Sequence, residues 1–420
     1  MREESEAHAP STHVGRGHAL RRNAFWMLVG NAAYAVCLWA TIAVLAKLGS
    51  AEAVGQFNLG FAIAGPIVLL LNLNLRALKA TDALEEFPFP TYLSLRVICA
   101  AAAVAVTAII VVLSDYEKNT RHVILAVALA KAFESVSDIV HGLLQKHEEM
   151  VWIAVSRIAR GGLATAVVAI VFVASGQVLA STWGLVGAWL AVLLVLDLPV
   201  SRRFERLALS LDLDSLWRLF RTALPLGVVM MLINVNTNVP IYFLSAQYGE
   251  ATVGYYSAVN YIGIAASTVA GAIAQAAAPR LGRMYAEGRP GAARRLLLKL
   301  VPLGLAMGGF GAVVAHLVGP ELLSLLYTPE YADVAPVLEI LMLAYGLGFA
   351  AAFLGVALTA QRSLRIMIPI NLLTLVINVG LCWLLVPRSG MSGAAWSVGA
   401  ALAFKLCANY WAAFRILTHD

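Results

Sequence analysis

The chain has 420 residues, of which 60% are hydrophobic and 13% are charged, and its mean hydropathy is +0.80. This composition excludes a sizeable soluble domain and indicates a polytopic helical membrane protein. The net charge of +6 reflects basic residues in the loops between spans and contact with anionic lipid headgroups, and it does not indicate nucleic-acid binding.

Twelve apolar runs fill nearly the whole chain, and each is about 20 residues or longer, the length that a helix needs to cross a bilayer. We therefore expect an all-α protein with twelve transmembrane helices. The predicted spans are 25–46, 55–76, 91–113, 122–144, 151–174, 179–199, 223–247, 253–277, 296–318, 334–359, 364–386 and 391–415.

Basic residues predict the orientation of these spans. With the N-terminus inside, most of the 30 Lys and Arg residues fall in cytoplasmic segments, including Arg96, and only Lys47, Lys118, Arg121 and Arg388 fall outside. This asymmetry is typical of a protein whose two termini both lie in the cytoplasm. The first run is too long for a signal-peptide core, so we expect it to be retained as a span.

Short motifs recur at a nearly constant offset. Val54-Gly55 opens the second span and Val253-Gly254 opens the eighth, while Gly187 and Gly393 lie at the starts of the sixth and twelfth. Such patterns are common at helix starts, but two matches in the same order favour two six-helix lobes related by a pseudo-two-fold axis along the membrane normal.

The predicted lobes have a short connection between them. The expected boundaries are a cytoplasmic N-terminal segment at 1–24, an N-lobe at 25–199, a cytoplasmic linker at 200–222, a C-lobe at 223–415 and a cytoplasmic tail at 416–420. In the linker, Asp214 and Ser215 suit the cap of a short helix that lies in the membrane interface.

The fourth span carries the densest set of charges. Lys131, Glu134, Asp138 and His141 fall on one helical stripe, and a charge at bilayer depth costs about 2.5–3.5 kcal/mol. The stripe therefore faces a water-filled cavity, or it pairs internally through Lys131 and Glu134 and locks helices together.

The fifth span carries Arg157 and Arg160 one turn apart. Two guanidinium groups on one helix face suit bidentate binding of phosphate. The alternative is that both side chains reach the phosphates of the inner leaflet. Arg76, at the inner end of the second span, joins the same basic rim or anchors the helix at the interface.

The second half carries mainly neutral polar residues within its spans. Amides and a tyrosine suit contacts with sugar hydroxyls, but they also hold membrane helices together. The candidates for sugar contact are Asn234, Asn238, Tyr242, Asn260 and Asn371.

Two carboxylates stand alone, and no enzyme motif is present. Glu339 is a candidate carrier of a coupling proton, whereas Asp197 is interpreted as a marker of the inner boundary. We find no phosphate-binding glycine loop, no nucleophile motif and no Cys/His cluster. We therefore expect no catalytic residue, no cofactor and no metal site, and the sequence leaves a coupling ion, H⁺ or Na⁺, open.

Several segments together resemble a known family: LAKLG at 45–49, FAIAGP at 61–66, NLNLR at 72–76, ALPL at 223–226, VGYY at 253–256 and APRL at 278–281. They are similar to Wzx-type polysaccharide flippases of the multidrug/oligosaccharidyl-lipid/polysaccharide (MOP) exporter superfamily. The resemblance implies two helical bundles around a cavity that opens alternately to each side of a bacterial cytoplasmic membrane.

The implied cargo is an undecaprenyl-pyrophosphate-linked oligosaccharide that moves to the outer leaflet for O-antigen, capsule or exopolysaccharide assembly. Family members bind the pyrophosphate with cationic cavity residues, and Lys131, Arg157 and Arg160 fit that description. The implied partners are this cargo, membrane lipids and polysaccharide polymerase or export machinery, and a monomer is expected. Two alternatives stay open: a cation-coupled multidrug exporter that uses Glu134 and Asp138, and a membrane enzyme of envelope assembly.

Overall fold

The computed structural model describes residues 12–82, 85–361 and 364–416, and within these ranges the chain is helical. The first eleven residues of the predicted N-terminal segment and most of the predicted tail lie outside the described residues. The elements are α1 (Thr12–Leu48), α2 (Ala51–Asn72), α3 (Leu75–Thr81), α4 (Phe89–Val112), α5 (Lys118–Lys146), α6 (Met150–Ser175), α7 (Val178–Val192), η1 (Leu193–Asp197), α8 (Leu198–Ser201), α9 (Leu213–Ala286), α10 (Pro290–Leu326), η2 (Pro329–Val334), α11 (Ala335–Ala360) and α12 (Leu364–Ile416).

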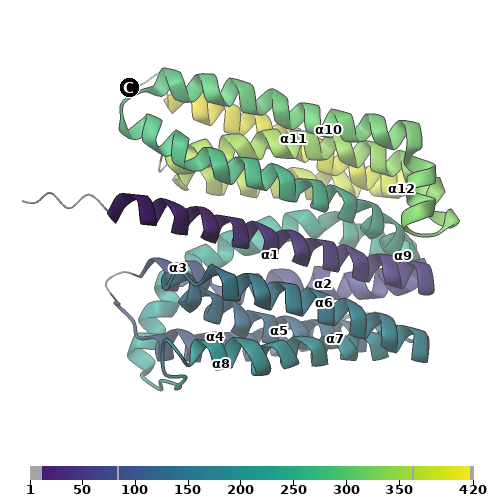
Figure 1. Ribbon diagram of the computed structural model, residues 1–420. Helices are drawn as coiled ribbons and strands as arrows, with labels where there is room; N and C mark the ends of the chain where they lie inside the picture. The colour runs from purple at the N-terminus through teal and green to yellow at the C-terminus, as the bar shows by residue number, and fades with distance from the viewer. Residues whose placement is uncertain (1–11, 83–84, 362–363, 417–420) are drawn as a thin grey trace, which may run out of the picture.

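Two helices fold back on themselves at a glycine. Gly249 in α9 has φ 80° and ψ −175°, and Gly390 in α12 has φ 53° and ψ −130°. Glycine adopts these angles without a steric penalty. A straight helix of the length of α9 would extend about 110 Å, but Figure 1 shows that α9 and α12 each turn back and run alongside their neighbours. Each therefore contains two of the predicted spans.

In the part of the chain that the structure describes, nine helices are long and apolar enough to cross a membrane, with α9 and α12 counted once each. The helix α5 is not among them because the charged stripe lowers its hydropathy. The fold is thus that of an all-α polytopic membrane protein.

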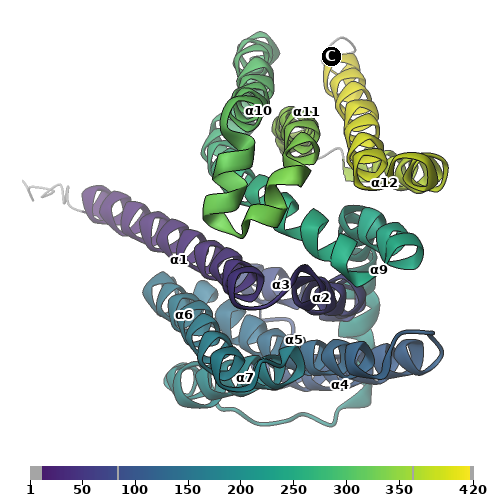
Figure 2. The same cartoon turned by 90° about the vertical axis from the view of Figure 1, so that its right-hand side faces the viewer.

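The helices gather in two groups around a central contact. Figures 1 and 2 show α4 to α8 on one side, α10 to α12 on the other, and α1, α2 and α9 between them. The most extensive contact between elements is that of α2 with α9, and α1 packs along α6. The helices α1, α2 and α9 therefore lie between the two groups.

At one end of this central contact, α2 and α9 approach each other through glycines. A Cβ atom on Gly55 would lie 1.8 Å from the Glu250 carbonyl oxygen, and one on Gly254 would lie 1.7 Å from that of Ala51. One turn further along, the Asn58 amide donates a hydrogen bond to the Ser257 hydroxyl. One offset of 199 residues relates Ala51, Gly55 and Asn58 of α2 to Glu250, Gly254 and Ser257 of α9.

The predicted linker helix is not a separate segment. Asp212 caps the N-terminus of α9 by accepting hydrogen bonds from the backbone amides of Asp214 and Ser215. From Leu213 the helix continues directly into its first arm (213–248), and its second arm (250–286) follows the reversal at Gly249. The expected cap at Asp214 and Ser215 was therefore wrong by two to three residues, because an aspartate earlier in the chain takes that role.

Candidate functional site

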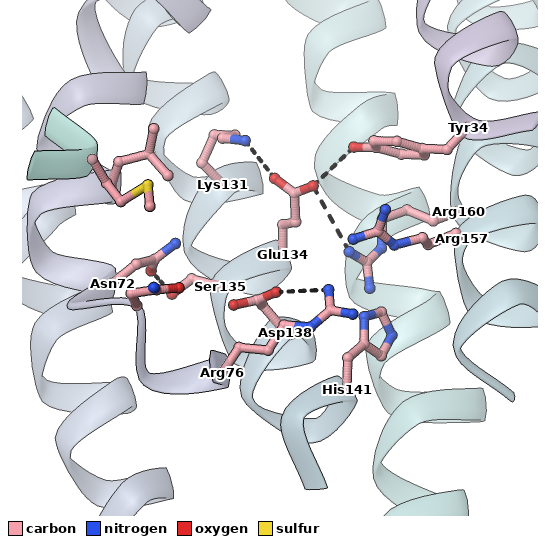
Figure 3. A pocket seen from close by; sticks show the side chains of 13 residues that line it. Tyr34, Asn72, Arg76, Lys131, Glu134, Ser135, Asp138, His141, Arg157 and Arg160 are labelled. Atoms are coloured by element: carbon pink, nitrogen blue, oxygen red, sulfur yellow. Dashed lines mark hydrogen bonds and ion pairs between the residues drawn. The ribbon is translucent and has the colours of Figure 1, made fainter. Parts of the chain in front are cut away.

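A cavity of about 270 Å³ lies between α1, α2, α3, α5, α6 and the first arm of α9 (Figure 3). It brings together all four predicted pyrophosphate candidates and three of the four predicted coupling candidates. We call it the charged pocket. Its lining residues are Tyr34, Leu69, Asn72, Asn74, Arg76, Lys131, Glu134, Ser135, Asp138, His141, Arg157, Arg160 and Met230.

A local break in the second predicted span places Arg76 at this pocket. The helix α2 ends at Asn72, and Leu73 and Asn74 adopt left-handed backbone angles before α3 begins. The guanidinium of Arg76 then lies 3.3 Å from the Asp138 carboxylate, and its Nε donates a hydrogen bond to Gln145 over 3.3 Å. Arg76 is therefore part of the pocket wall.

The polar stripe of α5 both lines the pocket and pairs internally. Lys131 donates to Glu134 one turn further along, and its Nζ lies 5.9 Å from the ring centres of Phe61 and Trp189. The Tyr34 hydroxyl donates to Glu134 over 2.8 Å. The same residues of the stripe therefore line a cavity and also form the bonds that hold neighbouring helices together.

Arg96 was expected in a cytoplasmic segment, and the structure corrects this. The helix α4 begins at Phe89, so Arg96 lies two turns inside the helix, where it is fully buried. It donates to the Ser135 hydroxyl over 3.2 Å and lies 3.6 Å from the Asp138 carboxylate. Arg96 therefore does not line the pocket itself but holds two residues that do, Ser135 and Asp138.

Asp197 was interpreted as a boundary marker, and this was also wrong. A π-helical turn, η1, ends at Asp197, whose side chain is buried against α5 and α6. Arg160 donates to it over 3.0 Å, and His141 Nε2 lies 3.5 Å from its other oxygen. Arg160 also lies 3.9 Å from Glu134. Arg160 and His141 line the pocket but are held in place by a buried carboxylate.

Arg157 differs from the other cations of the pocket. Its guanidinium donates to the side-chain oxygen of Asn31 on α1, and it forms no ion pair with any residue in the described ranges. Neither Asn31 nor Tyr34 was predicted from sequence, because a lone amide or tyrosine in an apolar helix carries no pattern.

The pocket and its wall carry a surplus of positive charge. Three carboxylates face five cations, so two positive charges are not balanced by ionised side chains. The cations are Arg76, Arg96, Lys131, Arg157 and Arg160, and the carboxylates are Glu134, Asp138 and Asp197.

The polar candidates of the second half do not line the charged pocket. They make hydrogen bonds within or between helices: Asn238 to Asn234, Tyr242 to the Ala62 carbonyl, Tyr345 to Asn260, and Asn371 to the Met367 carbonyl. Glu339 lies 3.1 Å from His316, and both side chains are exposed on the surface of α10 and α11. Their present contacts are those of residues that hold helices together.

A second cavity adjoins the charged pocket. It measures about 490 Å³ and lies between α1 and the second arm of α9, and its lining is mostly apolar. We call it the α1/α9 groove. Its lining residues are Asn23, Met27, Leu28, Asn31, Met150, Thr268, Ala272, Gln275 and Ala276. Asn31 lines this groove and contacts Arg157, which lines the charged pocket.

Among the described residues, no group of three or more His, Cys, Asp and Glu side chains is arranged to hold a metal ion.

The sequence matches known protein families. A family model described as polysaccharide biosynthesis protein matches residues 20–285, and the MatE model matches residues 225–384. The capsular polysaccharide biosynthesis protein CapF of Staphylococcus aureus is 25% identical over 403 residues, which cover 94% of this chain and 99% of CapF.

Solved structures show the same fold. The lipid II flippase MurJ in an inward closed conformation superimposes with a TM-score of 0.72 at 12% identity, over 95% of this chain and 87% of MurJ. An inward-facing multidrug resistance MATE transporter gives 0.69 at 14% identity, over 94% of this chain and 95% of the transporter. The predicted family resemblance is confirmed: the chain belongs to the polysaccharide biosynthesis protein family, and it has the multi-pass helical fold seen in the lipid II flippase and in a transporter of the MOP superfamily.

Proposed function

We propose that this transporter flips an undecaprenyl-pyrophosphate-linked oligosaccharide from the inner to the outer leaflet of a bacterial cytoplasmic membrane, for surface polysaccharide assembly. The observation that carries the proposal is the surplus positive charge of the charged pocket, with Arg157 free of any carboxylate in the described chain. A pyrophosphate has several anionic oxygens, which guanidinium groups bind bidentately.

The depth of these charges supports a role in binding. Lys131 lies within α5, and Arg157 and Arg160 lie within α6. In the proposed topology both helices cross the membrane, where an ionised group is costly unless it serves a site. Arg160 and Lys131 have carboxylate partners. Arg157 is therefore the primary candidate for the headgroup, with Lys131, Arg160 and Arg76 around it.

The helix arrangement supports alternating access between two lobes. We infer twelve spans with cytoplasmic termini, an N-lobe of 25–199 and a C-lobe of 223–415. The reciprocal contacts of Gly55 and Gly254 support a pseudo-two-fold axis through the junction of α2 and α9. In the proposed orientation this tight junction is at the outer side, and the charged pocket and the α1/α9 groove open toward the inner side.

The proposal also includes the sugars of the cargo and its delivery. Contacts of the cargo's sugars with Asn234, Asn238, Tyr242, Asn260 and Asn371 require those side chains to leave their present partners. A monomer that delivers its cargo to a polysaccharide polymerase or export machinery follows from the proposed pathway. No catalytic step and no cofactor is proposed.

A multidrug exporter coupled to H⁺ or Na⁺ is the second candidate, because the MatE model matches residues 225–384. In that case Glu134 and Asp138 would bind the cation or the cationic drug. Both carboxylates are already neutralised by arginine and lysine side chains, so the charge of the pocket favours an anionic cargo.

The test is transport of a fluorescent polyprenyl-pyrophosphate oligosaccharide in proteoliposomes that contain the purified protein. We expect Arg157→Ala to reduce flipping and equilibrium binding at least tenfold, equivalent to about 1.4 kcal/mol. The matched control is Arg388→Ala. It removes an exposed arginine that does not line the pocket and that donates a hydrogen bond to the Leu384 carbonyl.

The unfolding temperature and the elution profile of both variants establish that they are folded. Unchanged flipping in a folded Arg157→Ala variant would overturn the site assignment. Transport of lipophilic cations by the wild type, with no binding of the pyrophosphate lipid, would establish the exporter in its place.

A further inference from the structure

All but one of the cations at the charged pocket have a carboxylate partner. Arg76 and Arg96 share Asp138, Lys131 is bound to Glu134, and Arg160 is bound to Asp197. Arg157 is bound to an amide instead, because Asn31 supplies a neutral oxygen. The residue type at position 31 therefore decides whether the charge of Arg157 is available to a ligand.

An amide and a carboxylate at this position differ in charge but hardly in shape. Either oxygen can accept the hydrogen bond that orients the guanidinium. Only the carboxylate would form an ion pair of the kind that Arg160 makes with Asp197, and such charge-assisted pairs are the stronger ones.

We propose that Asn31 is the positioning residue for Arg157 and sets the charge of the headgroup that the transporter accepts. It fixes the guanidinium without neutralising it, so the charged pocket keeps enough positive charge to prefer a pyrophosphate over a monophosphate. This inference rests on the proposed function, since it specifies how that same site discriminates its cargo.

Asn31 and Arg157 lie between two cavities of different character. Asn31 lines the mostly apolar α1/α9 groove, and Arg157 lines the charged pocket. Their hydrogen bond thus stands where the two cavities meet. An amphiphile with its phosphates at Arg157 has a charged pocket on one side for its headgroup and an apolar groove on the other for its chain.

The experiment measures equilibrium binding of two probes, undecaprenyl pyrophosphate and undecaprenyl monophosphate, to the full-length protein in nanodiscs. We expect Asn31→Asp to weaken pyrophosphate binding at least tenfold and to abolish the preference for pyrophosphate over monophosphate. Asn31→Ser keeps the net charge of the pocket, so we expect a loss of less than about threefold (below 0.7 kcal/mol). Gln177→Glu is the matched control, because it adds the same charge at an exposed loop between α6 and α7.

A second route adds the charge after folding, in case Asn31→Asp does not fold. Asn31→Cys, in a chain whose four native cysteines are replaced, is modified with an anionic or with a neutral methanethiosulfonate. We expect the anionic adduct, and not the neutral one, to weaken pyrophosphate binding.

The outcomes separate the two proposals. If the wild type binds neither probe, the proposed function fails. If the wild type prefers the pyrophosphate but Asn31→Asp leaves that preference unchanged, the role of Asn31 is refuted while the function stands. Equal losses in Asn31→Asp and Asn31→Ser would show that Asn31 only supports the helix packing, and would also refute the inference.

Discussion

The first half of the chain gathers charged side chains from α3, α4, α5, α6 and η1 at one pocket, whereas the second half spreads neutral amides and tyrosines along its helices. Glu134 is contacted by side chains from two other helices, α1 and α6. By contrast, Asn238 and Asn371 bond backbone carbonyls one turn away on their own helices. Buried polar residues thus form a potential binding site where charges from several helices converge, and otherwise they serve to stabilise the helices.

The largest effect on stability is expected where the charges of the first half are buried. Arg160→Ala removes the arginine that is paired with the buried Asp197 carboxylate, and breaking a buried ion pair in this way costs about 3–5 kcal/mol. We expect a large fall in the unfolding temperature in detergent, with partial recovery in the double variant Arg160→Leu/Asp197→Leu. A stable Arg160→Ala variant would show that this cluster is not what holds α5, α6 and η1 together.

An intermediate effect is expected at the contact that the two halves share. Gly55→Ala and Gly254→Ala each place a methyl group less than 2 Å from a backbone oxygen, so α2 and α9 must separate at this junction. We expect Ser257→Cys, in a chain without other cysteines, to react several-fold faster with a membrane-impermeant maleimide in either variant. Gly187→Ala is the control, since nothing lies within 4 Å of its added methyl group. Unequal effects of the two variants would contradict the equivalence of the two halves.

A smaller effect is expected in the second half. Asn238→Ala removes a hydrogen bond to Asn234, and such bonds between membrane residues average about 0.6 kcal/mol. We expect a small decrease in the unfolding temperature and unchanged binding of the pyrophosphate probe. A tenfold loss of binding would instead place Asn238 in the cargo site and weaken the contrast between the halves.

The smallest effect is expected between the halves, at the cap of α9. Hydrogen bonds from the Ser215 hydroxyl and from backbone amides hold the pKa of Asp212 below its ordinary value of 3.8. A lowered pKa stabilises the folded state at pH values above that ordinary value, and the contribution is lost as the pH falls through the pKa of the folded protein. Asp212→Ala should therefore lower the unfolding temperature slightly at pH 7, with the difference from the wild type shrinking below about pH 4. A difference independent of pH would argue against an ionised cap.

The long helices and most of the pocket were predictable from sequence, for different reasons. Hydropathy over about 20 residues marks a span because the bilayer sets its length, and even the reversals at Gly249 and Gly390 fall between predicted spans. The stripe of α5 was predictable because Lys131, Glu134, Asp138 and His141 repeat with the period of one helix. That periodicity gives the face of a helix directly.

The partners across helices were not predictable. Asn31, Tyr34 and Asp197 are single polar residues in apolar segments, and only packing shows that they meet Arg157, Glu134 and Arg160. Arg96 was misplaced because a charge count cannot distinguish a loop residue from one two turns inside a helix. The sugar-contact candidates were chosen by residue type alone, which does not distinguish a binding residue from a structural one.

At the junction of α2 and α9, equivalent positions of the two halves, 199 residues apart, contact each other reciprocally. Contacts in which position i of one unit meets position j of the other, and j meets i, are those of an isologous dimer. We therefore expect the halves, expressed as two polypeptides split in the loop before Leu213, to associate through this junction. A duplicated and fused gene would account for such a contact, because a Cβ atom at either glycine would meet a backbone carbonyl of the other half in the same way.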